Sequence, residues 1–217
     1  MATHYAKSSV TISGDLIFHV RRLFSMAQEE ITRRGGSTAG AVHGAHLSPF
    51  AIPAYIVAVA SVESFVNEVF LSKFASLTFG EGLLPDDSAE KLELSLKLIL
   101  FPRLAFGRTL AKDKQPYQDM ALLIQLRNEL VHYKMEEKPP KPVTALAQRG
   151  IAARAPPEQE KMGGPHPWAD RVSTPEGIRW AHNVACATVA AVLDLMPDDK
   201  RVLLDALRHN FREIPKS

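Results

Sequence analysis

The sequence of 217 residues predicts an all-α protein: an up-and-down helical bundle of about five to six helices, with a proline-rich insertion after the fourth helix. Three observations support this fold class. Apolar residues recur at helical spacing in successive segments, and glycine and proline residues separate these segments. No run of β-branched residues offers the partner strand that a sheet would need.

The composition is that of an ordinary globular chain. Hydrophobic residues make up 46% and charged residues 23%, which excludes disordered, collagen-like and coiled-coil classes. The formal net charge of +2 is too small for a protein that coats nucleic acid, although it leaves room for a local basic patch. No internal repeat is present, so we expect a single helical domain over residues 1–217.

The sequence shows no sign of secretion or membrane insertion. Residues 1–9 contain no apolar run. The longest uncharged apolar stretch, residues 47–62, contains two prolines and is shorter than the roughly 20 residues of a membrane span. The single cysteine, Cys186, cannot form an internal disulfide and fits a reducing compartment. We therefore expect a cytoplasmic protein without a membrane partner.

Two helices are expected in the N-terminal third of the chain. An amphipathic pattern begins at Leu16 and ends at the glycine pair 35–36. A second helix is expected from about Pro53 to Phe79, with Gly80 closing it. Its first half is apolar nearly all round, which predicts a central, enclosed position.

The third helix is the ambiguous one. Asp87 and Glu90 resemble a capping box, but leucines alternate with polar residues from Leu92 to Leu98, which is a strand pattern. Leucine, glutamate and lysine favour helices and no partner strand is available, so we interpret this segment as a helix. Pro116 suits the first turn of the fourth helix, whose apolar residues fall on one side.

The rest of the chain begins with a change of composition. Eight of the fifteen prolines lie between Pro139 and Pro175, so we interpret residues 135–174 as an insertion or lid loop. Thr174 is expected to cap an alanine-rich helix whose small residues allow close packing. A last short helix is expected from about Asp198 to Phe211, and the tail from Ile214 should fray.

The fourth helix carries Arg127, Asn128 and His132 near its end. At about 100° per residue, Asn128 and His132 share one stripe and Arg127 lies on the adjacent one, so all three border the packing face. A guanidinium in this position needs a carboxylate, an anion or an interface, because an unpaired buried charge is costly. One interpretation is structural: Arg127 pairs with a carboxylate such as Glu63, and His132 caps the helix end. The other interpretation is a functional site.

The pattern is more specific with its polar residue than without it. An arginine and a histidine at this spacing are expected about 0.5 times by chance, but adding Asn128 lowers the expectation to about 0.01. With this motif near the end of an amphipathic helix, the chain resembles the HEPN superfamily of small α-helical bundles, whose signature is Arg, a polar residue, three further residues and His. The resemblance covers roughly residues 16–133 and the helix from Thr174.

This resemblance implies a metal-independent endoribonuclease without a cofactor. It implies a homodimer in which two motifs meet in one composite cleft that binds RNA. Arg127 would hold the scissile phosphate, Asn128 would orient it and His132 would act as acid or base. The chemistry is coherent, because an RNA 2′-hydroxyl can attack its neighbouring phosphate while an arginine fork stabilises charge and an imidazole moves protons.

The resemblance also implies partners and leaves an alternative open. HEPN proteins include toxins and defence effectors, so an antitoxin or regulatory protein is an expected partner. Other members are non-catalytic modules for dimerisation or for binding nucleotide, RNA or protein. In one subgroup of toxins the antitoxin modifies a tyrosine two residues after the histidine. Here Tyr133 follows His132 directly and Lys134 takes that position, which argues against this mode of control.

Three residues are candidates to support the motif. Glu63 and Asn67 lie one turn apart on the second helix and could orient Arg127, although a structural ion pair or an exposed face is the favoured interpretation. Tyr133 adjoins the histidine. Basic residues that could contact phosphate groups follow the motif: Lys134, Lys138 and Lys141.

Other conspicuous residues have plainer interpretations. His43 and His46 lie in a glycine-rich loop without further ligands, so we expect no metal site there. Cys186 is expected to be a buried, inert thiol among small apolar residues. Trp168 and Trp180 could stack on bases but are expected to be packing anchors.

Overall fold

The computed structural model describes residues 11–33, 48–70, 91–133, 138–152, 168–198 and 205–215. These residues form eight α-helices and no strand, which confirms the all-α prediction. The helices are α1 (Ile12–Arg33), α2 (Ala51–Phe70), α5 (Leu94–Phe106), α6 (Tyr117–Val131), α7 (Lys141–Gln148), α9 (Trp168–Val172), α10 (Pro175–Asp194) and α12 (Asp205–Asn210).

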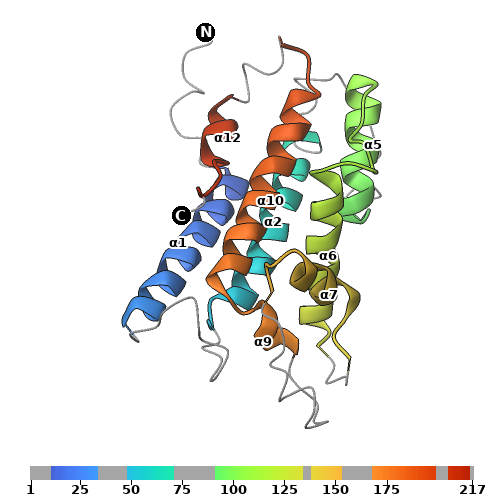
Figure 1. Cartoon of the computed structure of the whole chain (residues 1–217). Coiled ribbons are helices and arrows are strands. Elements are labelled where there is room, and N and C mark those ends of the chain that lie inside the picture. Colours follow the sequence, from blue (N-terminus) through green and yellow to red (C-terminus); the bar gives the residue numbers. More distant parts are fainter. Residues whose placement is uncertain are drawn as a thin grey trace.

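Four long helices, α1, α2, α6 and α10, pack together, and in Figure 1 α2 lies behind α10. Contacts at the helix ends fix their directions. The Ser13 backbone N–H at the start of α1 donates to Glu68 Oε1 near the end of α2 at 3.0 Å, so these helices are antiparallel. The Ser48 N–H before α2 donates to the Ser173 carbonyl before α10 at 3.2 Å, so α2 and α10 begin at the same end of the bundle.

Helix α2 is the centre of the bundle, as its apolar sequence predicts. It contacts α1, α5, α6 and α10. Its Tyr55 side chain is fully buried, and the hydroxyl donates to the Val172 carbonyl at 2.7 Å. Among the described helices, α2 is the one that is long and apolar enough to cross a membrane. Half of its most apolar 18-residue stretch is buried inside the bundle.

Helix α5 settles the ambiguous third segment. The alternating leucines form a helix that begins at Leu94, and its buried side includes Leu94, Leu98 and Phe101. Pro102 lies inside this helix, and Gly107 ends it with φ 67°, a left-handed conformation that favours glycine. The expected capping residues Asp87 and Glu90, like Gly35, Phe79 and Gly80, lie outside the described residues.

The segment predicted as an insertion or lid loop contains two helices, so a loop describes only part of it. Pro142 lies in the first turn of α7, where proline is tolerated, and Val143 and Leu146 on that helix are fully buried. Helix α9 buries Trp168, which confirms that this tryptophan is a packing anchor. Helix α7 packs on α6 and on α9, so this part of the segment belongs to the bundle.

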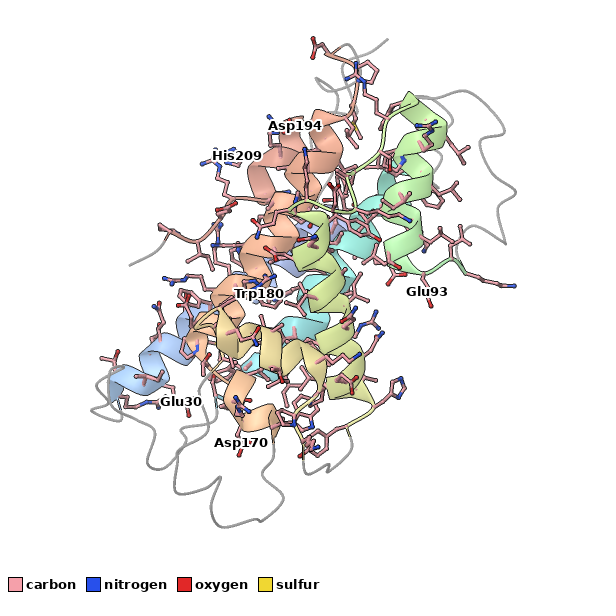
Figure 2. All side chains as sticks on the ribbon, turned by 45° about the vertical axis from the view of Figure 1, so that its right-hand side comes forward. Glu30, Glu93, Asp170, Trp180, Asp194 and His209 are labelled. Atoms are coloured by element: carbon pink, nitrogen blue, oxygen red, sulfur yellow. The ribbon has the colours of Figure 1, made fainter. Side chains whose placement is uncertain are left out.

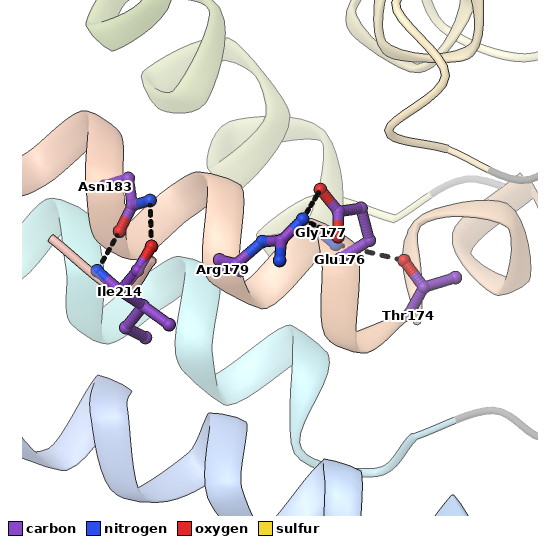
Figure 3. A network of polar contacts seen from close by, with 6 residues as sticks. All are labelled: Thr174, Glu176, Gly177, Arg179, Asn183 and Ile214. Carbon is purple, nitrogen blue, oxygen red and sulfur yellow. Dashed lines mark hydrogen bonds and ion pairs between the residues drawn. The ribbon is translucent and has the colours of Figure 1, made fainter. Parts of the chain in front are cut away.

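The C-terminal tail does not fray at Ile214, contrary to prediction. Asn183 Nδ2 on α10 donates to the Ile214 carbonyl at 2.8 Å, and the Ile214 N–H donates to Asn183 Oδ1 at 2.7 Å (Figure 3). Phe211 is buried with its ring 5.9 Å from that of Phe65. The tail from Phe211 to Pro215 is therefore part of the packed structure.

Candidate functional site

The candidate motif lies on the last turns of α6, and the core determines its orientation. Buried leucines and one methionine of α6 form the side that packs into the bundle: Met120, Leu123, Leu126 and Leu130. Because Leu126 and Leu130 point inward, Arg127 lies at the rim of this side and Asn128 points to solvent. The backbone N–H of His132 donates to the Asn128 carbonyl at 2.9 Å, and His132 ends the helix.

The three motif residues differ in exposure. Asn128 and His132 are exposed, whereas Arg127 is half-buried. The Nε atom of Arg127 is buried and has no hydrogen-bond partner in the part of the chain that is described. A buried donor without a partner costs about 1–3 kcal/mol, so a bound anion or a partner surface would stabilise this arginine.

Arg127 does not form the structural ion pair with Glu63 that the sequence suggested as one interpretation. Glu63 accepts from Lys97 Nζ at 3.4 Å, and Asn67 Oδ1 accepts from the same atom at 3.0 Å. Lys97 is fully buried on α5, so Glu63 and Asn67 bind this lysine and are not brought to Arg127. The sequence analysis missed Lys97, although its position at helical spacing from Leu94 and Phe101 placed it in an apolar stripe.

Tyr133 lies just beyond the end of α6. Its ring packs on that of Trp168 in α9, with centroids 5.2 Å apart and an interplanar angle of 39°. Of the three candidate lysines, Lys138 and Lys141 are exposed at the start of α7, and Lys134 lies outside the described residues. In Figure 2 Asp170 of α9 marks this end of the bundle, and Asp194 and His209 lie at the other end.

Helix α10 carries a buried histidine and a buried cysteine, His182 and Cys186. Cys186 is 1% exposed, and burial raises the pKa of its thiol to about 12, which confirms the expected inert cysteine. Its Sγ atom lies 3.7 Å from Nδ1 of His182, a neighbour that the sequence analysis missed despite its spacing of one helical turn. Burial lowers the pKa of His182 to about 4, so this imidazole is neutral near pH 7.

The half-buried Arg127 and the exposed Asn128 and His132 at the end of α6 suit the binding of an anion. A guanidinium can bind a phosphate through two parallel hydrogen bonds, and an imidazole can transfer protons near neutral pH. Among the described residues, no group of three or more histidine, cysteine, aspartate and glutamate side chains could hold a metal ion. The candidate site in one chain therefore consists of Arg127, Asn128 and His132, with Tyr133 at its edge.

Comparison with known proteins gave no match: no family model, no curated protein and no solved structure is significantly similar to this chain. A proposal about function therefore rests on the residues of this chain and on their geometry.

Proposed function

We propose that this chain is a metal-independent endoribonuclease of the HEPN type, acting in the cytoplasm as a toxin or defence effector. Arg127, Asn128 and His132 form its site. The observation that carries the proposal is the Arg127 guanidinium, whose buried Nε has no partner, on the same helix end as two exposed polar side chains. A phosphodiester of RNA would supply an anionic acceptor for the half-buried guanidinium as a whole.

The reaction is an attack by the RNA itself. The 2′-hydroxyl oxygen attacks the adjacent phosphorus, the bond from phosphorus to O5′ breaks, and the products carry a 2′,3′-cyclic phosphate and a 5′-hydroxyl. One imidazole removes the proton of the 2′-hydroxyl, and O5′ needs a proton as it leaves. Arg127 stabilises the charge that grows on the phosphoryl oxygens.

These two proton transfers support a composite site in a homodimer. In a concerted reaction a single imidazole cannot both accept the proton of the 2′-hydroxyl and donate a proton to O5′, so that route uses a second acid or base. A two-fold dimer that brings two copies of the α6 end together would supply two imidazoles and two guanidinium groups. An antitoxin or regulatory protein would act by blocking this cleft or the dimer.

A non-catalytic binding module is the second candidate. Val131 is 52% exposed and Tyr133 39% exposed beside His132, and exposed apolar side chains favour a contact with a partner. In that case the same surface would bind nucleotide, RNA or protein without cleavage.

RNA cleavage tests the proposal. Wild-type protein, Arg127→Ala and His132→Ala would be incubated with several RNAs in EDTA, and the ends of the products would be analysed. We expect cyclic phosphate ends from the wild type and a loss of at least about 100-fold in each variant. Arg103→Ala, which removes an exposed arginine of α5, is the matched control and should cleave normally. No cleavage by wild type would favour the binding module.

A further inference from the structure

We infer that Tyr133 is a stacking platform for a nucleobase beside the scissile phosphodiester, and that Trp168 holds this platform in place. The inference deepens the proposed function and rests on it, because the base belongs to the RNA strand that Arg127 and His132 would act on. No base identity is implied, since every base has a π-face that can stack on an aromatic ring.

The exposure of Tyr133 is unusual for an aromatic ring in this chain. Trp168 is 2% exposed and Tyr55 is fully buried. Among the described phenylalanine, tyrosine and tryptophan side chains, Phe18 and Tyr133 are the exposed ones. Phe18 lies on α1, whereas Tyr133 directly follows His132 of the motif.

The ring of Tyr133 is held by a chain of buried contacts. Trp168 packs against it from α9, and Ser173 Oγ donates to the Ala169 carbonyl at 2.9 Å. The Tyr55 hydroxyl of the central helix fixes Val172 at the end of α9. Because these contacts anchor Trp168 to the core, Trp168 offers the tyrosine ring a fixed surface, which would lower the conformational entropy lost on stacking.

The place of Tyr133 in the chain suits a base adjacent to the reacting phosphate. Helix α6 ends at His132, and Tyr133 is the next residue, just beyond the helix. Trp168 packs on the ring, and Tyr133 as a residue remains 39% exposed, so that part of it is open to solvent and to a base. Stacking on Tyr133 would hold the strand while Arg127 binds its phosphate.

Binding of an uncleavable strand tests this inference directly. The probes are a 2′-O-methyl uridine octamer and an abasic octamer with the same phosphates, each with a fluorescent end label, and the readout is anisotropy. We expect wild type and Tyr133→Phe to bind the uridine octamer about tenfold more tightly than the abasic octamer. This ratio of dissociation constants corresponds to about 1.4 kcal/mol. Tyr133→Leu keeps an apolar contact with Trp168 and should bind both octamers equally. Phe18→Leu is the control and should keep the preference.

The outcomes separate this inference from the proposed function. A wild type without any preference for the uridine octamer, or a preference that survives Tyr133→Leu, would overturn the stacking platform even if the protein cleaves RNA. A preference that depends on Tyr133 would support it even if no RNA is cleaved, and the ribonuclease proposal would then fail alone. If Tyr133→Leu lowers the dimer mass and leaves the preference intact, the ring is an interface contact and the inference is wrong.

Discussion

At the residue scale, Gly177 shows how closely α2 and α10 approach. A Cβ atom at this position would lie 2.0 Å from Tyr55 Oη and 2.9 Å from the Val172 carbonyl oxygen. The same turn is capped by Thr174, whose Oγ1 accepts from the Gly177 N–H at 3.0 Å (Figure 3). The absence of a side chain at Gly177 therefore lets the tyrosine reach the end of α9.

Gly177→Ala should lower the free energy of unfolding by about 1–3 kcal/mol, because overpacking at a buried contact forces atoms apart. The loss should be smaller in a Tyr55→Phe background, which removes the nearest clashing atom. A double-mutant cycle of chemical denaturation measures the difference. If Gly177→Ala lowers the free energy of unfolding equally with Tyr55 and with Phe at position 55, the close approach of position 177 to Tyr55 Oη would be contradicted.

His182 gives the molecule an acid-sensitive core. The imidazole is 1% exposed, and burial, together with nearby Arg21, lowers its pKa from 6.5 to about 4 against the opposing effect of a hydrogen bond to Asn183. In the unfolded chain the imidazole takes up a proton as the pH falls below about 6.5. The folded state does so only near pH 4, so acid favours unfolding between these values.

The free energy of unfolding should therefore fall between pH 6.5 and pH 4, by on the order of 3 kcal/mol from this residue at about 1.36 kcal/mol per pKa unit. His182→Gln should flatten that part of the curve, whereas His19→Gln, at an exposed position, should not. Denaturation measured across this pH range tests the prediction. An unchanged slope in His182→Gln would contradict it.

At the element scale, the tail from Phe211 to Pro215 is attached to α10 by one side chain. The Asn183 amide bonds both the N–H and the carbonyl of Ile214. Arg21 of α1 also donates to the Arg212 carbonyl. The tail therefore connects α1 and α10.

Asn183→Ala should lower the free energy of unfolding by about 1–2 kcal/mol, because it leaves two part-buried backbone groups of Ile214 without this partner. Hydrogen exchange at the Ile214 amide should become faster. Gln125→Ala, an exposed change on α6, is the control and should leave this exchange unchanged. A slow Ile214 amide in Asn183→Ala would show that other contacts hold the tail.

The helices were predictable where burial follows local periodicity. This applies to α1, α2, α6 and α10, whose apolar stripes are visible in the sequence. The tail and the segment around Trp168 were not predictable, because their order depends on contacts between distant residues, such as Asn183 with Ile214. The candidate site shows the same division: Arg127, Asn128 and His132 form a local pattern, whereas the binding of Glu63 to Lys97 depends on how α2 meets α5.

At the scale of the whole molecule, we expect a dimer. Each chain presents one guanidinium and one imidazole of the motif, and the proposed reaction needs a second acid or base. The mass in solution should be twice the 23.9 kDa of one chain. The specific activity should fall on dilution as the dimer dissociates. Full activity of a strictly monomeric protein would contradict a composite site.

The most direct test compares one RNA oligonucleotide in two forms, with ordinary ribose and with a 2′-O-methyl group at every position. Gel analysis in EDTA should show wild-type cleavage of the ribose form, with cyclic phosphate ends, and no cleavage of the methylated form. The result follows from attack by the 2′-hydroxyl, which the methyl group blocks. Cleavage of both forms, or of neither, would contradict the account.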